Sequence, residues 1–228
     1  MHARVVAVVV VLLGLSLPAM GAQSFVGGYS GNILTPDAVV APLGTWEASF
    51  HDFVEILGDE DLISFGVIYG IAPNFEIGAS FLNNDENDVV FSGKYELVTE
   101  TAARPAVLVG VFDAFGMAEW LSDDASFYLA VSKNVTPIAS DIADEPSKPL
   151  RLTAGFGSGV FDGFFAGLDW TLTPQFSLMA EYLNEGIGAD SQVDAGIRYA
   201  VSNSIRLDAA SIDFEDFAFG VTFTTRYQ

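Results

Sequence analysis

Residues 62–82 of this sequence constrain the fold more than any other stretch, because they alternate between two kinds of side chain. Before a break at residues 72–74, every second position is large and apolar: Ile63, Phe65, Val67, Tyr69 and Ile71. Glycine and serine lie between them, and residues 75–82 repeat the alternation with Glu76 on the polar side. A period of two predicts a β-hairpin. An apolar face opposite a face of glycine, serine and carboxylate is typical of strands in a membrane-spanning barrel.

The first 22 residues have the pattern of a secretory signal peptide. Arg4 precedes an apolar run over residues 5–17, and small residues follow it. This run is shorter than the roughly 20 residues that a membrane helix needs, so we expect cleavage after Gly21 or Ala22 and not a permanent anchor. No later apolar stretch is long enough for a helical span. A mature chain that crosses a membrane must therefore do so with strands that close into a barrel.

The same alternation predicts about twelve strands, an even number that fits bacterial barrels. They cover residues 45–54, 62–71, 74–82, 88–97, 105–114, 125–134, 150–157, 163–172, 175–183, 192–201, 204–211 and 216–227. We expect an all-β fold, an antiparallel up-and-down transmembrane barrel over residues 45–228. A secreted soluble β-sandwich is the alternative, because alternation alone does not distinguish the two.

The connections between these strands are of two kinds. Those at residues 72–74, 173–174 and 202–203 are short turns with Pro or Asn after a small residue, whereas most of the others are acidic loops such as residues 83–87. Outer-membrane barrels have short periplasmic turns and longer outer loops, so we expect the chain in the outer membrane with its acidic loops outside. The long connection at residues 135–149 falls on the periplasmic side and is an exception.

Two sets of side chains follow from the predicted facing of the strands. Aromatic residues near strand ends predict a girdle at the membrane interfaces: Trp46, Tyr69, Tyr95, Trp170, Tyr182, Tyr199 and Tyr227. Polar and charged residues predict a lumen charge network: Glu47, His51, Glu76, Lys94, Glu96, Arg151, Asp169, Glu181, Asp194, Arg198, Arg206, Asp208 and Arg226. These charges either select solutes in a pore or form ion pairs that fill and stiffen the barrel.

Composition excludes several functions. With 9 basic and 30 acidic residues and a net charge of -21, the chain lacks the basic patches that bind nucleic acid. There is no cysteine, so thiolate metal sites and a cysteine nucleophile are absent. After the signal, His51 is the only histidine, and we interpret it as structural rather than as the base of a triad. The acidic loops suit calcium in principle, but solvated loops are the simpler interpretation. We expect no catalytic residues, metal or cofactor.

Residues 23–44 precede the first predicted strand and contain several small residues. Gly27, Gly28 and Gly31 allow close approach of backbones, and residues 35–37 predict a turn. We expect this segment to cross the periplasmic mouth or to enter the lumen as a small plug. A simple leader to the first strand is the alternative.

The order Gly28-Tyr29-Ser30-Gly31-Asn32-Ile33-Leu34-Thr35-Pro36-Asp37-Ala38, with Gly44 and a strand after it, resembles the opening of the YjbH-type barrel proteins. The opening of that family is similar to G-x-x-G-[LI]-[IL]-x-T-P-x-A. The resemblance covers the N-terminal stretch, and the rest of the chain only as a general barrel pattern. It implies an outer-membrane protein associated with exopolysaccharide production.

These observations predict a non-enzymatic outer-membrane barrel, either a narrow pore or an envelope component linked to exopolysaccharide export. A structural or adhesion protein with a sealed lumen and acidic outer loops is the alternative. The expected partners are outer-membrane lipid, the barrel-assembly machinery, and a polysaccharide or small polar solute. Residues 223–228 resemble the C-terminal signal for barrel assembly, although the chain ends in Gln228.

Overall fold

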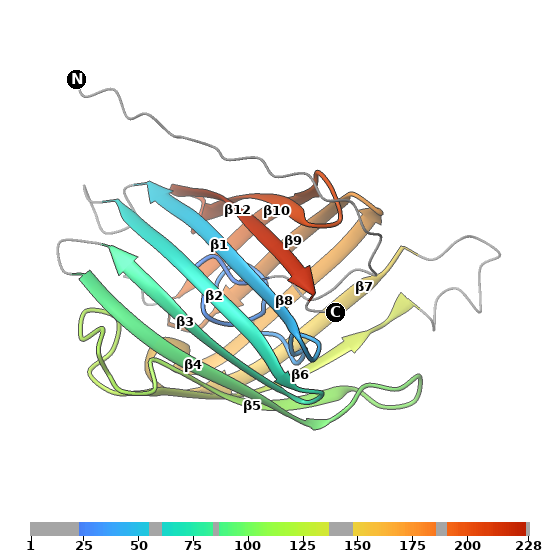
Figure 1. Cartoon of the computed structure of the whole chain (residues 1–228), viewed down its shortest axis with the longest axis horizontal. Coiled ribbons are helices and arrows are strands. Elements are labelled where there is room, and N and C mark those ends of the chain that lie inside the picture. Colours follow the sequence, from blue (N-terminus) through green and yellow to red (C-terminus); the bar gives the residue numbers. More distant parts are fainter. Residues whose placement is uncertain (1–22, 55–60, 84–86, 137–147, 186–190, 227–228) are drawn as a thin grey trace.

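The computed structural model describes residues 23–54, 61–83, 87–136, 148–185 and 191–226. These residues form twelve strands and one short 3-10 helix (Figure 1). In chain order the elements are β1 (Thr45–Val54), β2 (Leu62–Ala72), β3 (Phe75–Asn83), β4 (Asn87–Val98), β5 (Ala106–Phe112), β6 (Ser126–Asn134), β7 (Leu150–Gly157), η1 (Gly159–Phe161), β8 (Gly163–Thr173), β9 (Phe176–Leu183), β10 (Gln192–Ala200), β11 (Ile205–Ile212) and β12 (Asp216–Arg226).

The strands form one closed antiparallel barrel, in which each strand pairs with its neighbours in sequence and β1 pairs with β12. That last pairing runs from Thr45 opposite Arg226 to Val54 opposite Phe217 without a register shift. Closure leaves no free sheet edge, as a span through lipid requires. The predicted twelve-stranded transmembrane barrel is confirmed, and the alternative of a soluble sandwich is wrong.

One predicted strand is too long at both ends. The structure gives β5 as Ala106–Phe112, whereas alternation predicts residues 105–114. Pro105 has no N–H to give to a ladder. At the other end, Asp113 has a φ of 46°, a left-handed backbone conformation that ends an extended strand.

The barrel has two distinct ends. We call the end with residues 72–75, 173–176 and 200–205 the turn end, and the end with residues 113–125, 158–162 and 213–215 the loop end. The first described strand begins at the turn end with Thr45, and the last returns there with Arg226. Outer-membrane barrels turn tightly on the periplasmic side, so the turn end is the end that we expect to face the periplasm.

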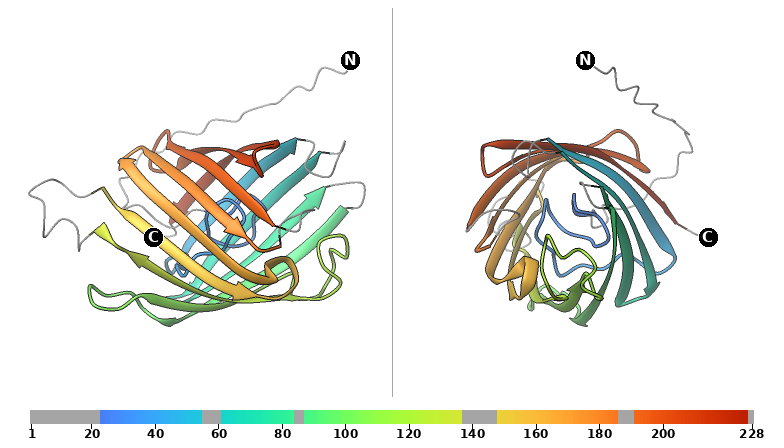
Figure 2. Two further views of the ribbon diagram at one scale, coloured as in Figure 1. Left: turned by 180° about the vertical axis from the view of Figure 1, so that it is seen from behind. Right: turned by 90° about the vertical axis from the view of Figure 1, so that its left-hand side faces the viewer.

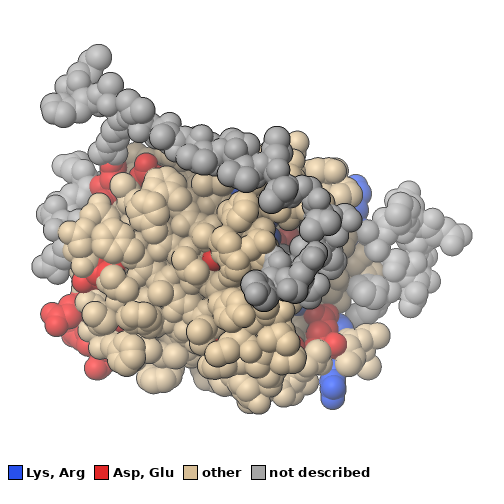
Figure 3. All heavy atoms as spheres, viewed as in Figure 1, with Lys and Arg blue, Asp and Glu red and all other residues tan. Residues whose placement is uncertain are grey.

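The outer surface of the barrel is apolar between these ends. Exposed side chains on it include Phe65 on β2, Phe91 on β4, Phe156 on β7 and Phe219 on β12. In the space-filling view, uncharged residues cover most of the visible side wall and charged residues gather toward its ends (Figure 3). An aqueous protein would not expose such a belt, so the belt faces lipid.

Most of the N-terminal segment, residues 23–44, lies inside the barrel (Figure 2). Every residue from 23 to 38 is buried. The segment loops against the inner wall and reaches β1 after Gly44, whose N–H donates to the carbonyl of Gly70 on β2 at 2.8 Å. Among the described residues, no helix is long and apolar enough to cross a membrane. We call residues 23–44 the plug from here on.

Candidate functional site

The plug is held at one point by a carboxylate of the barrel wall. Glu181 on β9 accepts the backbone N–H groups of Ile33, Leu34 and Thr35 at 3.1, 2.6 and 3.1 Å, and the hydroxyl of Thr35 at 2.7 Å. Three successive N–H groups that converge on one carboxylate form an anion-binding concavity. Glu181 is therefore an anchor of the plug.

A second anchor joins the plug to β3 and β4. Glu76 accepts the N–H and hydroxyl of Ser30, both at 2.8 Å, and the N–H of Ala41 at 2.6 Å. On the neighbouring strand, the fully buried Lys94 donates to the carbonyls of Ser30 and Val39 at 2.7 and 2.6 Å. Lys94 also forms an ion pair with Asp37 at 3.0 Å. A buried charge is tolerated when it is paired and hydrogen-bonded, and both conditions hold here.

A third cluster of predicted lumen residues lies where the plug begins. The ring of His51 stacks on Phe25 of the plug, with centroids 4.5 Å apart, and its Nε2 lies 3.5 Å from Asp208. Arg198 pairs with Asp208 at 2.6 Å and donates to the carbonyl of Gln23 at 3.4 Å. The structure thus places His51 in packing contact with the plug.

Most of the remaining predicted lumen residues are bonded to groups of the barrel wall and its connections. Arg206 pairs with the buried Glu47 at 2.7 Å. Asp194 accepts both hydrogen bonds of the Gln192 amide at 2.8 and 2.9 Å. Glu96 lies apart from the network, near the turn end, and accepts a hydrogen bond from Thr99 at 3.2 Å.

Two of the predicted residues lie at the C-terminal end of the chain. Arg226 is the last residue of β12, but its side chain lies outside the described part of the structure. Tyr227 of the predicted girdle lies outside the described residues altogether.

The other girdle residues are distributed unevenly between the two ends. Tyr69, Tyr95, Trp170 and Tyr199 are exposed on the outer surface near the turn end. Trp46, also near the turn end, is less exposed than these residues. It is half-buried because its ring packs against that of Phe223, with centroids 5.6 Å apart. Tyr182 is exposed near the loop end.

Glycines of the inner wall give the plug its close fit. A Cβ on Gly66 of β2 would lie 2.5 Å from the Cα of Gly27, and a Cβ on Gly78 of β3 would collide with the carbonyl of Gly28. Gly27 and Gly28 themselves have φ values of 78° and 72°, a backbone conformation that residues with a side chain rarely adopt. Backbone therefore packs directly on backbone along this wall.

The half of the lumen toward the loop end is filled by apolar side chains. Phe53, Leu62, Leu82, Phe112, Phe165 and Leu183 project inward from the strands and are buried. Tyr29 of the plug meets them, with its ring 5.3 Å from that of Phe112 and 5.9 Å from that of Phe161 in η1. Burial raises the pKa of Tyr29 well above its ordinary value, so its phenol stays neutral.

Residues 113–125 fold over this apolar half. Asp113 accepts the N–H groups of Met117 and Ala118 at 2.9 and 2.8 Å, which holds the loop in a turn. Trp120 donates its indole N–H to Asp88 at 2.8 Å and packs on the core. Loop and plug together occupy the interior from the loop end to the middle of the barrel.

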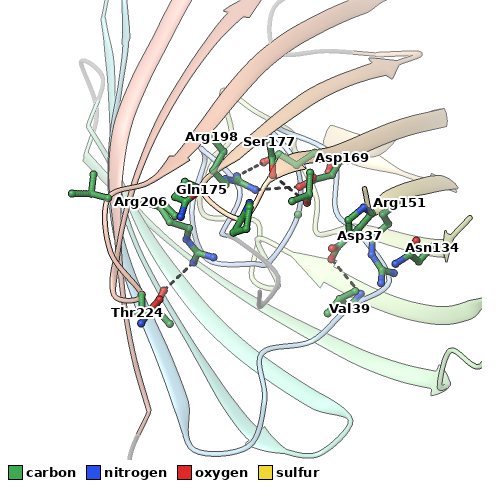
Figure 4. Close-up of a pocket in the computed structure, with 18 of the residues that line it drawn as sticks. Asp37, Val39, Asn134, Arg151, Asp169, Gln175, Ser177, Arg198, Arg206 and Thr224 are labelled. Carbon is green, nitrogen blue, oxygen red and sulfur yellow. Dashed lines mark hydrogen bonds and ion pairs between the residues drawn. The ribbon is translucent and has the colours of Figure 1, made fainter. Parts of the chain in front are cut away.

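Toward the turn end the interior is polar and contains a pocket of about 660 Å³. Its inner limit is the plug, through Asn32, Asp37 and Val39, and its walls come from strands β6 to β12 and the connections between them (Figure 4). Arg151, Asp169, Arg198 and Arg206 line it. The uncharged polar side chains that line it are amides and hydroxyls, namely Asn134, Thr171, Gln175, Ser177, Ser202, Asn203 and Thr224. Pro149, Pro174, Ala200 and Val201 add apolar surface.

Sequence analysis missed several residues of this interior. The sequence predicts only a turn at Asp37, yet Asp37 pairs with Lys94. Glu100, in the connection between β4 and β5, pairs with Arg151 at 2.9 Å and with Lys133 at 3.4 Å. Burial opposes ionisation of Glu100, but the N–H of Asn134 and the charge of Arg151 outweigh it and hold the pKa of Glu100 below its ordinary value. No periodic pattern marks Glu100, because it lies outside the strands.

The sequence predicts no metal site in this chain. The residues that the structure describes contain no group of three or more His, Asp or Glu side chains that could hold an ion. Two clusters suit calcium by composition, residues 59–61 and 83–88, and residues 59–60 and 84–86 of them lie outside the described residues.

Comparison with known proteins identifies the fold but no family. No family model matches the chain, and no curated protein matches it. The KdgM porin is similar in structure, with a TM-score of 0.51 at 11% identity over 81% of this chain and 99% of the porin. The outer membrane protein Omp33 of Acinetobacter baumannii gives a TM-score of 0.50 at 11% identity, over 80% of this chain and 98% of Omp33. With its closed strands and apolar belt, the chain is an outer-membrane β-barrel with a porin-like fold.

Proposed function

We propose that this chain is a non-enzymatic outer-membrane envelope protein whose lumen is closed by its own N-terminal segment. The observation that carries this proposal is the burial of residues 23–38 inside the barrel, where Glu76, Lys94 and Glu181 bind their backbone groups. These three side chains belong to the predicted lumen charge network. Their hydrogen bonds to the plug favour the interpretation that the network fills and stiffens the barrel.

Energetics favour a plug that stays in place. A hydrogen bond to a charged group contributes about 1.5–3 kcal/mol, and a buried charge that loses its partner costs about 3–5 kcal/mol. Removal of the plug would strip partners from Glu76, Lys94 and Glu181 at once. It would also expose the apolar contacts of Phe25 and Tyr29 to water. We therefore expect the plug to stay in place unless a bound protein or ligand replaces these hydrogen bonds and apolar contacts.

A narrow pore is the second candidate function. Two observations favour it, the charged pocket at the turn end and the fold shared with the KdgM porin. Conductance in planar bilayers separates the two candidates, because a closed lumen passes no ions and a pore gives discrete current steps.

We also propose a link to exopolysaccharide production. The residues that resemble the YjbH-type opening, Gly28 to Ala38, lie within the plug and are buried. A deletion strain tests this proposal, since it should produce less surface polysaccharide than the parent and recover with the intact gene. An unchanged amount of polysaccharide would reject the link without bearing on the closed lumen. The expected partners remain outer-membrane lipid and the barrel-assembly machinery.

A further inference from the structure

The pocket at the turn end contains two charged side chains whose ion pairs and hydrogen bonds within the protein are incomplete. Most of its charged groups have close buried partners: Arg206 lies 2.7 Å from Glu47, Arg198 lies 2.6 Å from Asp208, and Asp37 lies 3.0 Å from Lys94. These pairs leave little net charge on most of the pocket surface. Arg151 and Asp169 are different.

Arg151 and Asp169 are opposite in charge and occupy facing positions on neighbouring strands. They are register partners in the β7–β8 pairing, so their side chains start about 5 Å apart on the same face. Their side chains are 28% and 27% exposed, more than those of Arg198 and Arg206. Figure 4 shows both among the side chains that surround the pocket.

Arg151 and Asp169 each have a partner in the protein, but these partners use only part of the hydrogen-bonding capacity of the two side chains. Arg151 pairs with Glu100, which lies in the connection after β4 and does not line the pocket. Asp169 has a long contact with Arg198, 3.8 Å, and a side-chain hydrogen bond with Ser177. The guanidinium Nε of Arg198 binds Asp208 instead. A guanidinium has five N–H donors and a carboxylate accepts about four hydrogen bonds.

The rest of the pocket limits the chemistry of a ligand further. Its described lining residues include no aromatic side chain, so the face of a sugar ring would find no stacking partner. A simple anion would meet the carboxylates of Asp37 and Asp169 in the same space. A volume of about 660 Å³ lies within the usual range for small-molecule sites.

We infer that this pocket binds a small zwitterion, an amino acid or short peptide, with Arg151 holding its carboxylate and Asp169 its ammonium group. The surrounding amides and hydroxyls then bind the polar backbone between the two charges. Since we expect the turn end to face the periplasm, the ligand would enter from there. The inference concerns the pocket alone and holds whether or not the lumen conducts.

Calorimetric titration of the purified full chain in detergent tests the inference with four probes. Diglycine carries both charges, N-acetyldiglycine lacks the cation, glycylglycinamide lacks the anion, and sucrose is a neutral control. Diglycine should bind, and each blocked peptide should bind at least about tenfold more weakly because it loses one charge-assisted contact. Sucrose should bind more weakly still.

Variants assign the two contacts. Asp169→Asn should weaken diglycine about tenfold and remove the preference for diglycine over N-acetyldiglycine. Arg151→Gln should remove the preference over glycylglycinamide, and Arg151→Lys should restore part of it. The matched controls Asp162→Asn and Arg104→Gln change exposed residues outside the pocket and should leave binding unchanged.

Three results would overturn the inference: no binding of diglycine, equal binding of the blocked peptides, or tighter binding of sucrose. The four-probe titration uses only the natural protein, so it tests the inference even if a variant fails to fold. A negative result in this experiment would not affect the proposal that the lumen is closed, because conductance in planar bilayers tests that proposal.

Discussion

Glu181 on β9 binds Thr35 of the plug through both the backbone N–H and the side-chain hydroxyl, at 3.1 and 2.7 Å. The two residues are 146 positions apart in the sequence, so this contact joins the N-terminal segment to a distant strand of the wall. It couples the stability of the plug to that of the wall.

Replacement of Glu181 by Ala should destabilise the protein by roughly 3–5 kcal/mol, because three buried N–H groups of the plug lose their acceptor. Urea unfolding followed by tryptophan fluorescence measures the change. Glu185→Ala is the matched control, since Glu185 is exposed beyond the end of β9. Equal stability of the Glu181 variant and the control would show that the anchor contributes nothing.

Replacement of Lys94 by Met should cost about 3–5 kcal/mol, since it leaves the carboxylates of Asp37 and Glu76 buried without a cation. The double variant with Glu76→Gln should be less destabilised than the sum of the two single variants, because the cation and one carboxylate are then removed together. Thermal unfolding of the four proteins gives the coupling. Strict additivity would contradict the shared role that the contacts with Ser30 indicate.

Gly78→Ala should displace the plug, because the new methyl group would collide with the carbonyl of Gly28. Limited proteolysis should then cleave residues 23–44 faster than in the natural protein. Gly93→Ala is the matched control on the next strand, where a Cβ would meet no atom closer than 3.8 Å. If both variants resist protease equally, the backbone contact does not determine the position of the plug.

Stability should fall in acid partly through Glu100. Its pKa lies below its ordinary value of 4.5, so its contribution is present above about pH 4.5 and is lost as the pH falls through the lower folded-state value. Glu100→Gln should therefore show a smaller loss of thermal stability between pH 7 and pH 3 than the natural protein. The effect is modest, since Glu100 is partly exposed to solvent. An identical loss in both proteins would exclude this role.

The barrel could be predicted from sequence because strand pairing and lipid exposure both act on a period of two. The predicted β1, for instance, has the same bounds as the observed strand, Thr45–Val54. The partners of the inward charges could not be predicted, since Glu76, Lys94 and Glu181 bind backbone groups of a segment without periodicity. Every residue has a backbone C=O group and every residue except proline has an N–H group, so these groups leave no distinctive mark in a sequence.

The apolar filling of the loop-end half also escaped prediction. Alternation assigns one face to lipid and the other to a polar lumen, but adjacent apolar residues such as Phe81 with Leu82 and Phe164 with Phe165 place apolar side chains on both faces. Such pairs near the loop-end termini of strands are the available signal. They indicate a core inside the barrel, where a water-filled pore would have polar residues at the inward positions.

Single-channel recording in planar bilayers tests the closed lumen most directly. The natural protein should insert and give no current steps, whereas Glu181→Ala, which loosens the plug, should give occasional steps. Insertion is verified separately by heat-modifiable migration of the protein recovered from the bilayer-forming vesicles. Stable, discrete conductance from the natural protein, with residues 23–44 still resistant to protease, would contradict the account.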